Sequence, residues 1–257
     1  MLTNIFDSHC HYEDEAFDED RDELLSTGLK EGGVVAVIHA GANLERSQMG
    51  VDMAEKYDFM YAAVGVHPQD VDDLPDNYLD ILREMTKSEK VVAIGEIGLD
   101  YHYDEYDREK QLRVFEEQLI LAQELDLPVS IHSRDAMGDT MELLRRYKPK
   151  GVMHCFSGSP EIARELQELG MYVSFTGVLT FKNAKRAVES MLAVADDRLL
   201  LETDCPYMAP EPNRGKRCDS RMICHVAEKI AELRNMDAQA VIDMANANTC
   251  RLFGITL

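Results

Sequence analysis

Short apolar runs recur along this chain, and amphipathic stretches with helical spacing separate them. Eight runs of small or β-branched apolar residues are typical of buried parallel strands: 4–6, 34–38, 60–66, 91–94, 128–131, 151–153, 171–175 and 199–202. Helices are predicted over 20–31, 44–56, 78–85, 108–124, 140–147, 160–169, 183–194, 222–235 and 238–252. Eight strands that alternate with helices predict an α/β fold, a closed (β/α)8 barrel of the TIM type.

The alternation runs from end to end, so we expect a single barrel domain over residues 1–257. A doubly wound open sheet is the alternative, but no Gly-x-Gly-x-x-Gly follows the first strand. A Pro-rich loop over 206–212 follows the eighth strand, and the two helices after it are the natural last helices of the barrel.

The charge balance limits the binding partners of the protein. Twenty-seven Lys and Arg residues against 48 Asp and Glu residues give a formal charge of −21, which argues against tight non-specific binding to a polyanion. Contact with a nucleic acid would therefore have to be local. Basic residues concentrate near the motifs described below only over 214–217 and at Lys182, Lys185 and Arg186, and a solvated charged face is the alternative interpretation of both groups.

The sequence also indicates a compartment. No apolar run approaches the roughly 20 residues of a membrane span, and the first residues lack a basic segment followed by an apolar one. We expect a cytoplasmic protein with no membrane partner. The six cysteines form no Cys-x-x-Cys pair, which argues against a zinc ribbon and favours reduced thiols.

Glu96 is the most unusual residue in the apolar pattern. It stands directly behind the run over 91–94, where an unpaired ionised carboxylate costs several kcal/mol. Gly95 and Gly98 flank it without bulk, which suits close approach of a ligand or of other backbone. Something positive should therefore lie beside Glu96.

Residues that bind metals follow the apolar runs. His9 and His11, two positions apart, point to one side of an extended backbone. Later runs are followed by His39, His67, Glu96, His132, His154 and Asp204. Because the carboxyl ends of all barrel strands converge on one face, these nitrogens and oxygens predict a site for zinc or another divalent transition metal. A structural zinc needs only four ligands, so a larger set suggests a catalytic pair of metals bridged by Glu96.

Six segments together resemble the TatD family of metal-dependent deoxyribonucleases, within the amidohydrolase-like barrels. They are 6–11, 64–68, 95–101, 132–136, 154–158 and 201–207, and residues 248–254 look like the ending of that family. The resemblance implies one metal held by His9, His11, Glu96 and Asp204. It implies a second held by Glu96, His132 and His154.

The resemblance also implies roles outside the metal ligands. His67 would place the substrate phosphate or, if protonated, assist the leaving group, and Arg134 is the next candidate for a phosphate contact. The charge balance, rather than the resemblance, suggests that Arg134, Lys216 and Arg217 supply local attraction for the substrate. His39 receives no such role and is interpreted as a histidine that supports a ligand or packs in the core. After Arg217 the family continues Asn-Glu-Pro, whereas this chain has 218-Cys-Asp-Ser-220 in a segment that resembles a substrate-facing loop.

The resulting hypothesis is hydrolysis of a phosphodiester by two divalent cations, with Asp204 as general base. The substrate would be DNA with single-stranded or frayed ends, or else RNA or a small phosphoester. A hydrolase of a small amide, lactone or phosphoester on the same scaffold stays open, as does a non-catalytic metal-stabilised protein. The ions could be zinc, manganese, iron, nickel or magnesium. The sequence leaves the oligomeric state open, with a monomer favoured.

Overall fold

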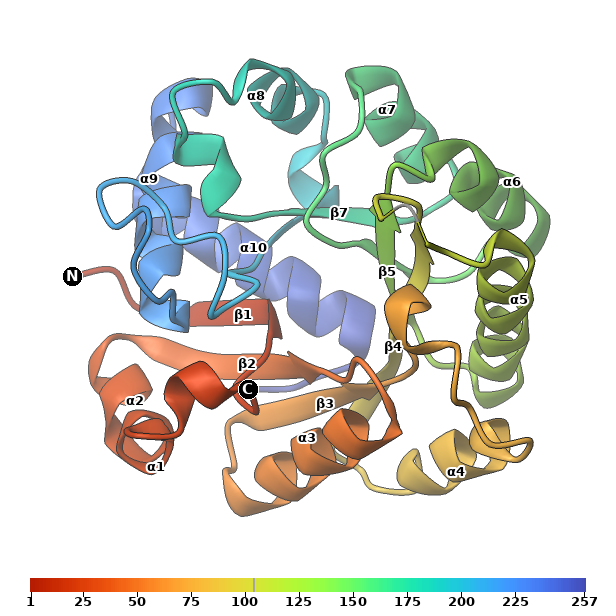
Figure 1. Cartoon of the computed structure of the whole chain (residues 1–257). Coiled ribbons are helices and arrows are strands. Elements are labelled where there is room, and N and C mark those ends of the chain that lie inside the picture. The colour runs from red at the N-terminus through yellow and green to blue at the C-terminus, as the bar shows by residue number, and fades with distance from the viewer. Residues whose placement is uncertain (104) are drawn as a thin grey trace.

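The computed structural model describes residues 1–103 and 105–257, and in that part the chain forms one sheet of parallel strands in the order β1 to β8 (Figure 1). The strands are β1 Ile5–Cys10, β2 Val34–Ala40, β3 Met60–Val64, β4 Val91–Asp100, β5 Val129–Arg134, β6 Gly151–Met153, β7 Tyr172–Phe175 and β8 Leu199–Leu201. Each pairs with the next in parallel register. The predicted (β/α)8 barrel is confirmed.

Helices surround this barrel. They are α1 Arg21–Glu23, α2 Leu29–Glu31, α3 Leu44–Lys56, α4 Tyr78–Met85, α5 Arg108–Leu125, α6 Met137–Tyr147, α7 Pro160–Glu168, α8 Lys185–Leu192, α9 Ile223–Arg234 and α10 Ala238–Phe253. The stretch expected as one helix over 20–31 is divided, because a π-helical turn, Leu24–Gly28, lies between α1 and α2. Short 3-10 helices cover Glu15–Phe17, Pro68–Asp70, Gly177–Thr180, Asp196–Arg198 and Ser220–Met222. A membrane span demands a longer or more apolar helix than any that the described residues form.

Capping residues fix where several helices begin. The side chains of Asn43, Asp107, Ser159 and Asp237 accept hydrogen bonds from backbone N–H groups in the first turns of α3, α5, α7 and α10. Each cap satisfies a donor that the helix itself leaves free. The helices α3, α5 and α7 therefore start at defined points after strand ends, whereas α10 starts at a defined point after α9.

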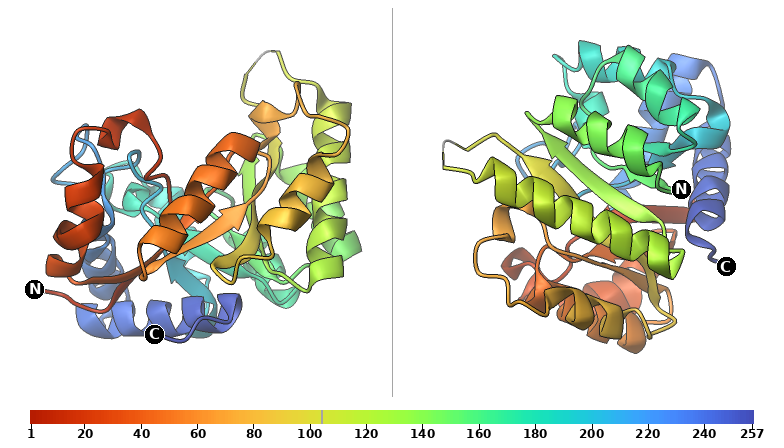
Figure 2. Two further views of the ribbon diagram at one scale, coloured as in Figure 1. Left: turned by 90° about the horizontal axis from the view of Figure 1, so that it is seen from below. Right: turned by 90° about the vertical axis from the view of Figure 1, so that its right-hand side faces the viewer.

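Buried apolar residues form two clusters on the two sides of the sheet. Phe6, Ala36, Ala93 and Leu200 belong to a cluster that also includes Phe253 at the end of α10. The larger cluster includes helix residues together with strand residues one position away from these, such as Ile5, Val37, Ile94 and Leu201. Figure 2 shows α10 lying along one end of the barrel. This end is packed shut, which leaves the carboxyl ends of the strands as the open face.

Among the strands that extend further than the apolar pattern predicts, three carry predicted metal ligands in their extensions. β1, β4 and β5 continue through His9, Glu96 and His132, whereas the pattern ended them at residues 6, 94 and 131. The backbone of Glu96 still donates to Gly41 O (2.9 Å), and the β4–β5 register shifts between Ile94 and Ile97. Polar side chains can occupy these strand positions because they point into the barrel mouth and meet one another there.

The barrel closes between β8 and β1 by a different arrangement. In the described residues only an isolated bridge, Cys10 to Cys205, joins the two edges, just beyond the end of β8. The backbone of Asp204 donates to His9 O (3.0 Å). Buried Asp7 accepts hydrogen bonds from the hydroxyls of Thr203 (2.5 Å) and Ser220 (2.6 Å), and burial raises the pKa of its carboxyl to about 7 despite these bonds. Side chains thus complete this junction between β8 and β1, which we call the seam. It lies beside the predicted metal ligands.

Candidate metal centre

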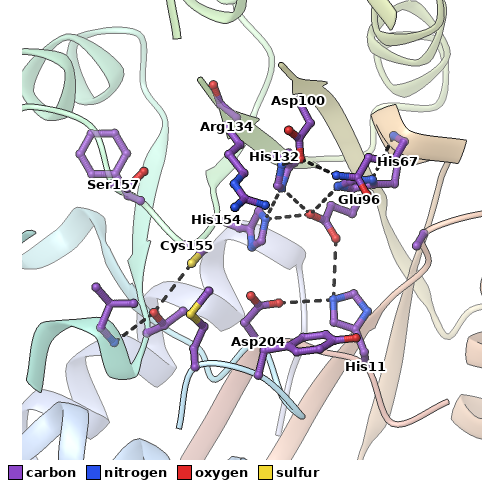
Figure 3. A pocket seen from close by; sticks show the side chains of 18 of the residues that line it. His11, His67, Glu96, Asp100, His132, Arg134, His154, Cys155, Ser157 and Asp204 are labelled. Atoms are coloured by element: carbon purple, nitrogen blue, oxygen red, sulfur yellow. Dashed lines mark hydrogen bonds and ion pairs between the residues drawn. The ribbon is translucent and has the colours of Figure 1, made fainter. Parts of the chain in front are cut away.

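A pocket of about 630 Å³ opens at the carboxyl ends of the strands, on the face where active sites of such barrels are built. Its lining includes these predicted site residues: His11, His67, Glu96, His132, Arg134, His154 and Asp204. His9 lies just beneath the lining and is buried. Histidines and carboxylates from strands far apart in the sequence therefore meet at one point (Figure 3).

Glu96 occupies the middle of this group. Its Oε1 lies 2.9 Å from both His132 Nδ1 and His154 Nε2. Its Oε2 lies 3.4 Å from His9 Nε2 and 3.7 Å from His11 Nε2. Burial opposes ionisation of this carboxyl, but the surrounding histidines outweigh burial and hold its pKa well below its usual range. The partners that the apolar pattern around Glu96 required are these four imidazoles.

Asp204 joins the group from the loop after β8. Its Oδ1 lies 3.4 Å from His11 Nε2 and 3.8 Å from His9 Nε2. The residue adopts φ = 58°, in the left-handed region, and its hydrogen bond to His9 O helps to hold it there. Burial would raise the pKa of Asp204, yet the hydrogen bond with His11 and the nearby histidines lower it below the ordinary value. Asp204 is thus an ionised carboxylate with 14% of its side chain exposed.

The outward nitrogens of three histidines face side-chain oxygens. His9 Nδ1 lies 3.3 Å from Ser130 Oγ, His132 Nε2 lies 3.2 Å from Asp100 Oδ2, and His154 Nδ1 lies 3.5 Å from Glu202 Oε1. The first two contacts are hydrogen bonds, and such partners fix the tautomer and orientation of a histidine whose other nitrogen binds a metal. His154 Nδ1 lies near Glu202 without forming a hydrogen bond. The sequence reasoning missed Ser130, Asp100 and Glu202. Their signal was present, because Asp100 and Glu202 stand in the same motifs as Glu96 and Asp204.

Four groups of three donors among the described residues could hold a metal ion, and two of them belong to the predicted ligand sets. The ligand atoms of His9, His11 and Glu96 lie within 4.8 Å of one another, and so do those of Glu96, His132 and His154. Imidazole-rich sets of this kind suit zinc, manganese, iron or nickel. Two imidazole nitrogens, on His9 and His11, also point at each other across only 3.1 Å, which a shared cation would explain. The inward nitrogens and both oxygens of Glu96 are therefore arranged as ligands.

The charges around His11 also favour a cation at this position. Burial opposes protonation of this imidazole, but Asp204, Glu13 and Glu96 raise its pKa to about 10. The carboxylates thus hold a positive charge at this position. A metal ion would supply that charge in place of the proton.

His67 lies at the edge of the centre, with Nε2 3.6 Å from Glu96 Oε1. Its Nδ1 accepts a hydrogen bond from the backbone N–H of Gln69 (3.2 Å), which leaves Nε2 as the protonated nitrogen. Burial lowers its pKa to about 3, so the imidazole is neutral near pH 7. Burial thus disfavours the protonated form of His67, which was one of the two possibilities that the sequence raised.

The predicted basic contacts divide into two groups. Arg134 lines the pocket, and its guanidinium lies 5.6 Å from the centre of the Tyr103 ring. Arg217 instead donates to both oxygens of Asp20 (2.6 Å each) and covers the ring of Phe17, and neither it nor exposed Lys216 belongs to the pocket lining. The prediction that Lys216 and Arg217 contact the substrate is therefore not supported. Lys216 lies outside the pocket lining, and the guanidinium of Arg217 is engaged by Asp20 and the ring of Phe17.

The segment 218-Cys-Asp-Ser-220 does not face the substrate either, which corrects the expectation from the sequence. All three residues are buried. Ser220 donates to Asp7 and Asp219 pairs with Arg221, so the segment belongs to the seam between β8 and β1. The departure from the Asn-Glu-Pro pattern thus alters barrel closure rather than the pocket wall.

Comparisons with known proteins agree with this geometry. The family model described as TatD related DNase matches residues 6–254. The chain is 42% identical over 254 residues to YabD of Bacillus subtilis, an uncharacterized metal-dependent hydrolase, with 98% of this chain and 99% of YabD covered. It is 34% identical over 258 residues to the 3'-5' ssDNA/RNA exonuclease TatD of Cronobacter sakazakii, with 97% of each chain covered. The crystal structure of YjjV, a TatD homologue from Escherichia coli K12, superposes with a TM-score of 0.93 at 31% identity over 100% of both chains.

Proposed function

Because the chain belongs to the TatD-related DNase family of metal-dependent hydrolases, we propose that it hydrolyses phosphodiester bonds in DNA with single-stranded or frayed ends. RNA and small phosphoesters are further substrates of the same chemistry. One observation carries the proposal: Glu96 divides its two oxygens between two pairs of histidines at the base of an open pocket. A carboxylate that bridges two cations would hold them close together, as two-metal hydrolysis requires.

His9, His11, Glu96 and Asp204 would hold one divalent cation, and Glu96, His132 and His154 would hold the other. When bound, the two cations would supply Lewis acidity toward the phosphate and lower the pKa of the attacking water. Zinc, manganese, iron and nickel suit the imidazoles, and magnesium suits the phosphate oxygens. These assignments make Glu96 the only residue that both positions share.

Three side chains would act on the substrate. Asp204 would accept the proton of the attacking water, because its carboxylate is ionised and lies open to the pocket. Neutral His67 would donate its Nε2–H to a phosphate oxygen. Arg134, at the rim, would contact a second phosphate along the strand.

The pocket walls favour an unpaired strand over a duplex. One wall carries the apolar side chains of Phe156, Leu179 and Met208, and the rim carries Tyr103 and Tyr207, whose exposed fractions are 55% and 53%. Aromatic and apolar faces accept bases that have left the stack. A chain with a charge of −21 has little general attraction for a long duplex. The Cronobacter relative named as an ssDNA/RNA exonuclease supports the same substrate class.

The test is a substrate panel with protein that has been stripped by EDTA and reloaded with Mg²⁺, Mn²⁺ or Zn²⁺. End-labelled single strands, covalently closed single-stranded circles, blunt duplex, RNA and bis(4-nitrophenyl) phosphate are compared at equal phosphate concentration. We expect linear single strands to be degraded at least about tenfold faster than circles. Equal rates on strands and circles would contradict action at ends, and no phosphodiester cleavage with any ion would overturn the proposal.

A further inference from the structure

Buried polar atoms without a hydrogen-bond partner concentrate behind His11. In the part of the chain that the structure describes there are four such side-chain atoms, and three of them are His11 Nδ1, Glu13 Oε1 and His39 Nδ1. Each unsatisfied buried group costs about 1–3 kcal/mol. Three of them in one small cluster, next to the candidate metal centre, suggest a functional arrangement.

The geometry of His11 indicates a function for these unpartnered atoms. Its Nε2 points to the centre, 3.1 Å from His9 Nε2 and 3.4 Å from Asp204 Oδ1. A histidine can offer its Nε2 lone pair to a cation only when the proton is on Nδ1, and that proton needs an acceptor. The carboxylate beside Nδ1 is Glu13, whose Oε1 lies 3.8 Å away.

Glu13 is held from behind by His39. Its Oε2 lies 2.6 Å from His39 Nε2, and 2% of its side chain is exposed. His39 is fully buried and sits against Gly50 of α3, where an added Cβ would lie 2.1 Å from Nδ1. On the pocket side, Arg46 Nη1 lies 3.6 Å from Glu13 Oε1. The carboxylate is therefore fixed between a buried histidine and an arginine, with one oxygen directed at His11.

We propose that Glu13 is the positioning residue for His11, and that the His39–Glu13 pair sets the cation affinity of the position formed by His9, His11, Glu96 and Asp204. The inference rests on the proposed pair of metal positions. It gives His39, which lies near the end of β2 but outside the pocket lining, a specific task. The position at His132 and His154 has its own carboxylates, Asp100 and Glu202, and is independent of this pair.

The experiment measures ion binding instead of turnover. Stripped protein is titrated with Zn²⁺ against a chromophoric chelator, and ion content after dialysis is read by mass spectrometry. Glu13→Gln removes the acceptor charge and keeps the shape, so we expect one ion to bind as in the wild type and the other about 10- to 100-fold more weakly. Glu13→Asp, which restores the charge, should recover part of that loss. Glu15→Gln on the same segment is the matched control, because Glu15 is exposed and should leave both affinities unchanged.

A second variant, Gly50→Ala, acts on the His39–Glu13 pair through packing and changes no charge. Gly50→Ala should displace His39 and weaken the same ion, whereas Gly138→Ala in α6, where nothing lies within 4 Å of the added Cβ, should not. Melting temperatures of the stripped proteins report folding separately. Two ions bound at wild-type affinity in Glu13→Gln and in Gly50→Ala would overturn the inference and leave the proposed function intact. Wild-type protein that takes up no ion would overturn both.

Discussion

The two halves of the candidate metal centre differ in how their side chains are held. On the side of β4 to β6, Glu96 Oε1 lies 2.9 Å from His132 and from His154, and parallel strand ladders join β4 to β5 and β5 to β6. On the side of the seam, the corresponding distances from Oε2 to His9 and His11 are 3.4 and 3.7 Å. There an isolated bridge takes the place of a ladder.

This difference separates two ways of building a metal position. The sheet itself places His132 and His154, because their strands are fixed by backbone hydrogen bonds on both sides. The seam position depends on side chains, namely Asp7, which ties β1 to Thr203, and Glu13, which stands behind His11. We therefore expect the β4–β6 position to bind its ion more tightly and the seam position to exchange more readily.

The largest effect should come from the residue that both halves share. Glu96→Ala removes a ligand from each position, so we expect both ions to be lost and hydrolysis to fall by more than about a hundredfold, since loss of even an outer partner costs about 10- to 100-fold. His154→Ala, its control, should release one ion and retain the other. Ion content by mass spectrometry, measured with the rate, checks both. Two tightly bound ions in Glu96→Ala would mean that Glu96 does not bridge the halves.

Asp204 belongs to the seam half, and its proposed role as the general base can be tested directly. Asp204→Asn keeps the shape and an oxygen ligand but cannot accept a proton, so the maximal rate should fall at least about a hundredfold in protein reloaded with two ions. The KM for a single strand should change much less, because the phosphate contacts remain. An unchanged maximal rate at full ion content would contradict its role as the base.

Much of the half formed by β4 to β6 could be predicted from the sequence. The apolar runs locate the strands, and barrel geometry then requires the residues after them to meet on one face. Glu96, His132 and His154 follow directly from that argument, because backbone ladders determine where they lie. What the apolar pattern missed was that β4 and β5 continue through Glu96 and His132, since polar side chains end the pattern while the backbone goes on pairing. β6 does end at Met153, directly before His154.

The seam half was harder to predict, because its contacts join residues about as far apart in sequence as the chain allows. Ser220 bonds to Asp7 across 213 positions, and Arg217 bonds to Asp20 across 197. No local pattern indicates that Asp20, rather than a substrate phosphate, takes the guanidinium. Glu13 was missed for a related reason: its importance comes from His39 on the neighbouring strand, and nothing in the segment around Glu13 signals it.

The rim of the pocket offers a smaller test, with one tyrosine on each half. Tyr103 lies near Arg134 beyond β4, and Tyr207 lines the pocket beyond β8. If bases stack on them, each change to Ala should weaken binding of a single strand by about 1–3 kcal/mol, and each change to Phe should not. Hydrolysis of bis(4-nitrophenyl) phosphate, which has no strand to bind, is the control and should stay near the wild-type rate. A larger loss for Tyr207→Ala would indicate that the strand enters over the seam.

The smallest effect should come from the outer edge of the seam, where Asp20 holds Arg217. The hydrogen bonds from Arg217 lower the pKa of Asp20, so the ionised carboxylate stabilises the folded chain above its unfolded pKa, and this contribution is lost as the pH falls through the folded value. Because the pair is partly exposed, Asp20→Asn should cost only about 0.5 kcal/mol of unfolding free energy at pH 7. The cost should shrink as the pH falls below the ordinary aspartate pKa of about 3.9, as urea unfolding over a pH series can measure. The rate on single strands should stay unchanged, because Arg217 lies outside the pocket. A several-fold loss of rate would instead indicate that Arg217 contacts the substrate and that the seam is part of the binding surface.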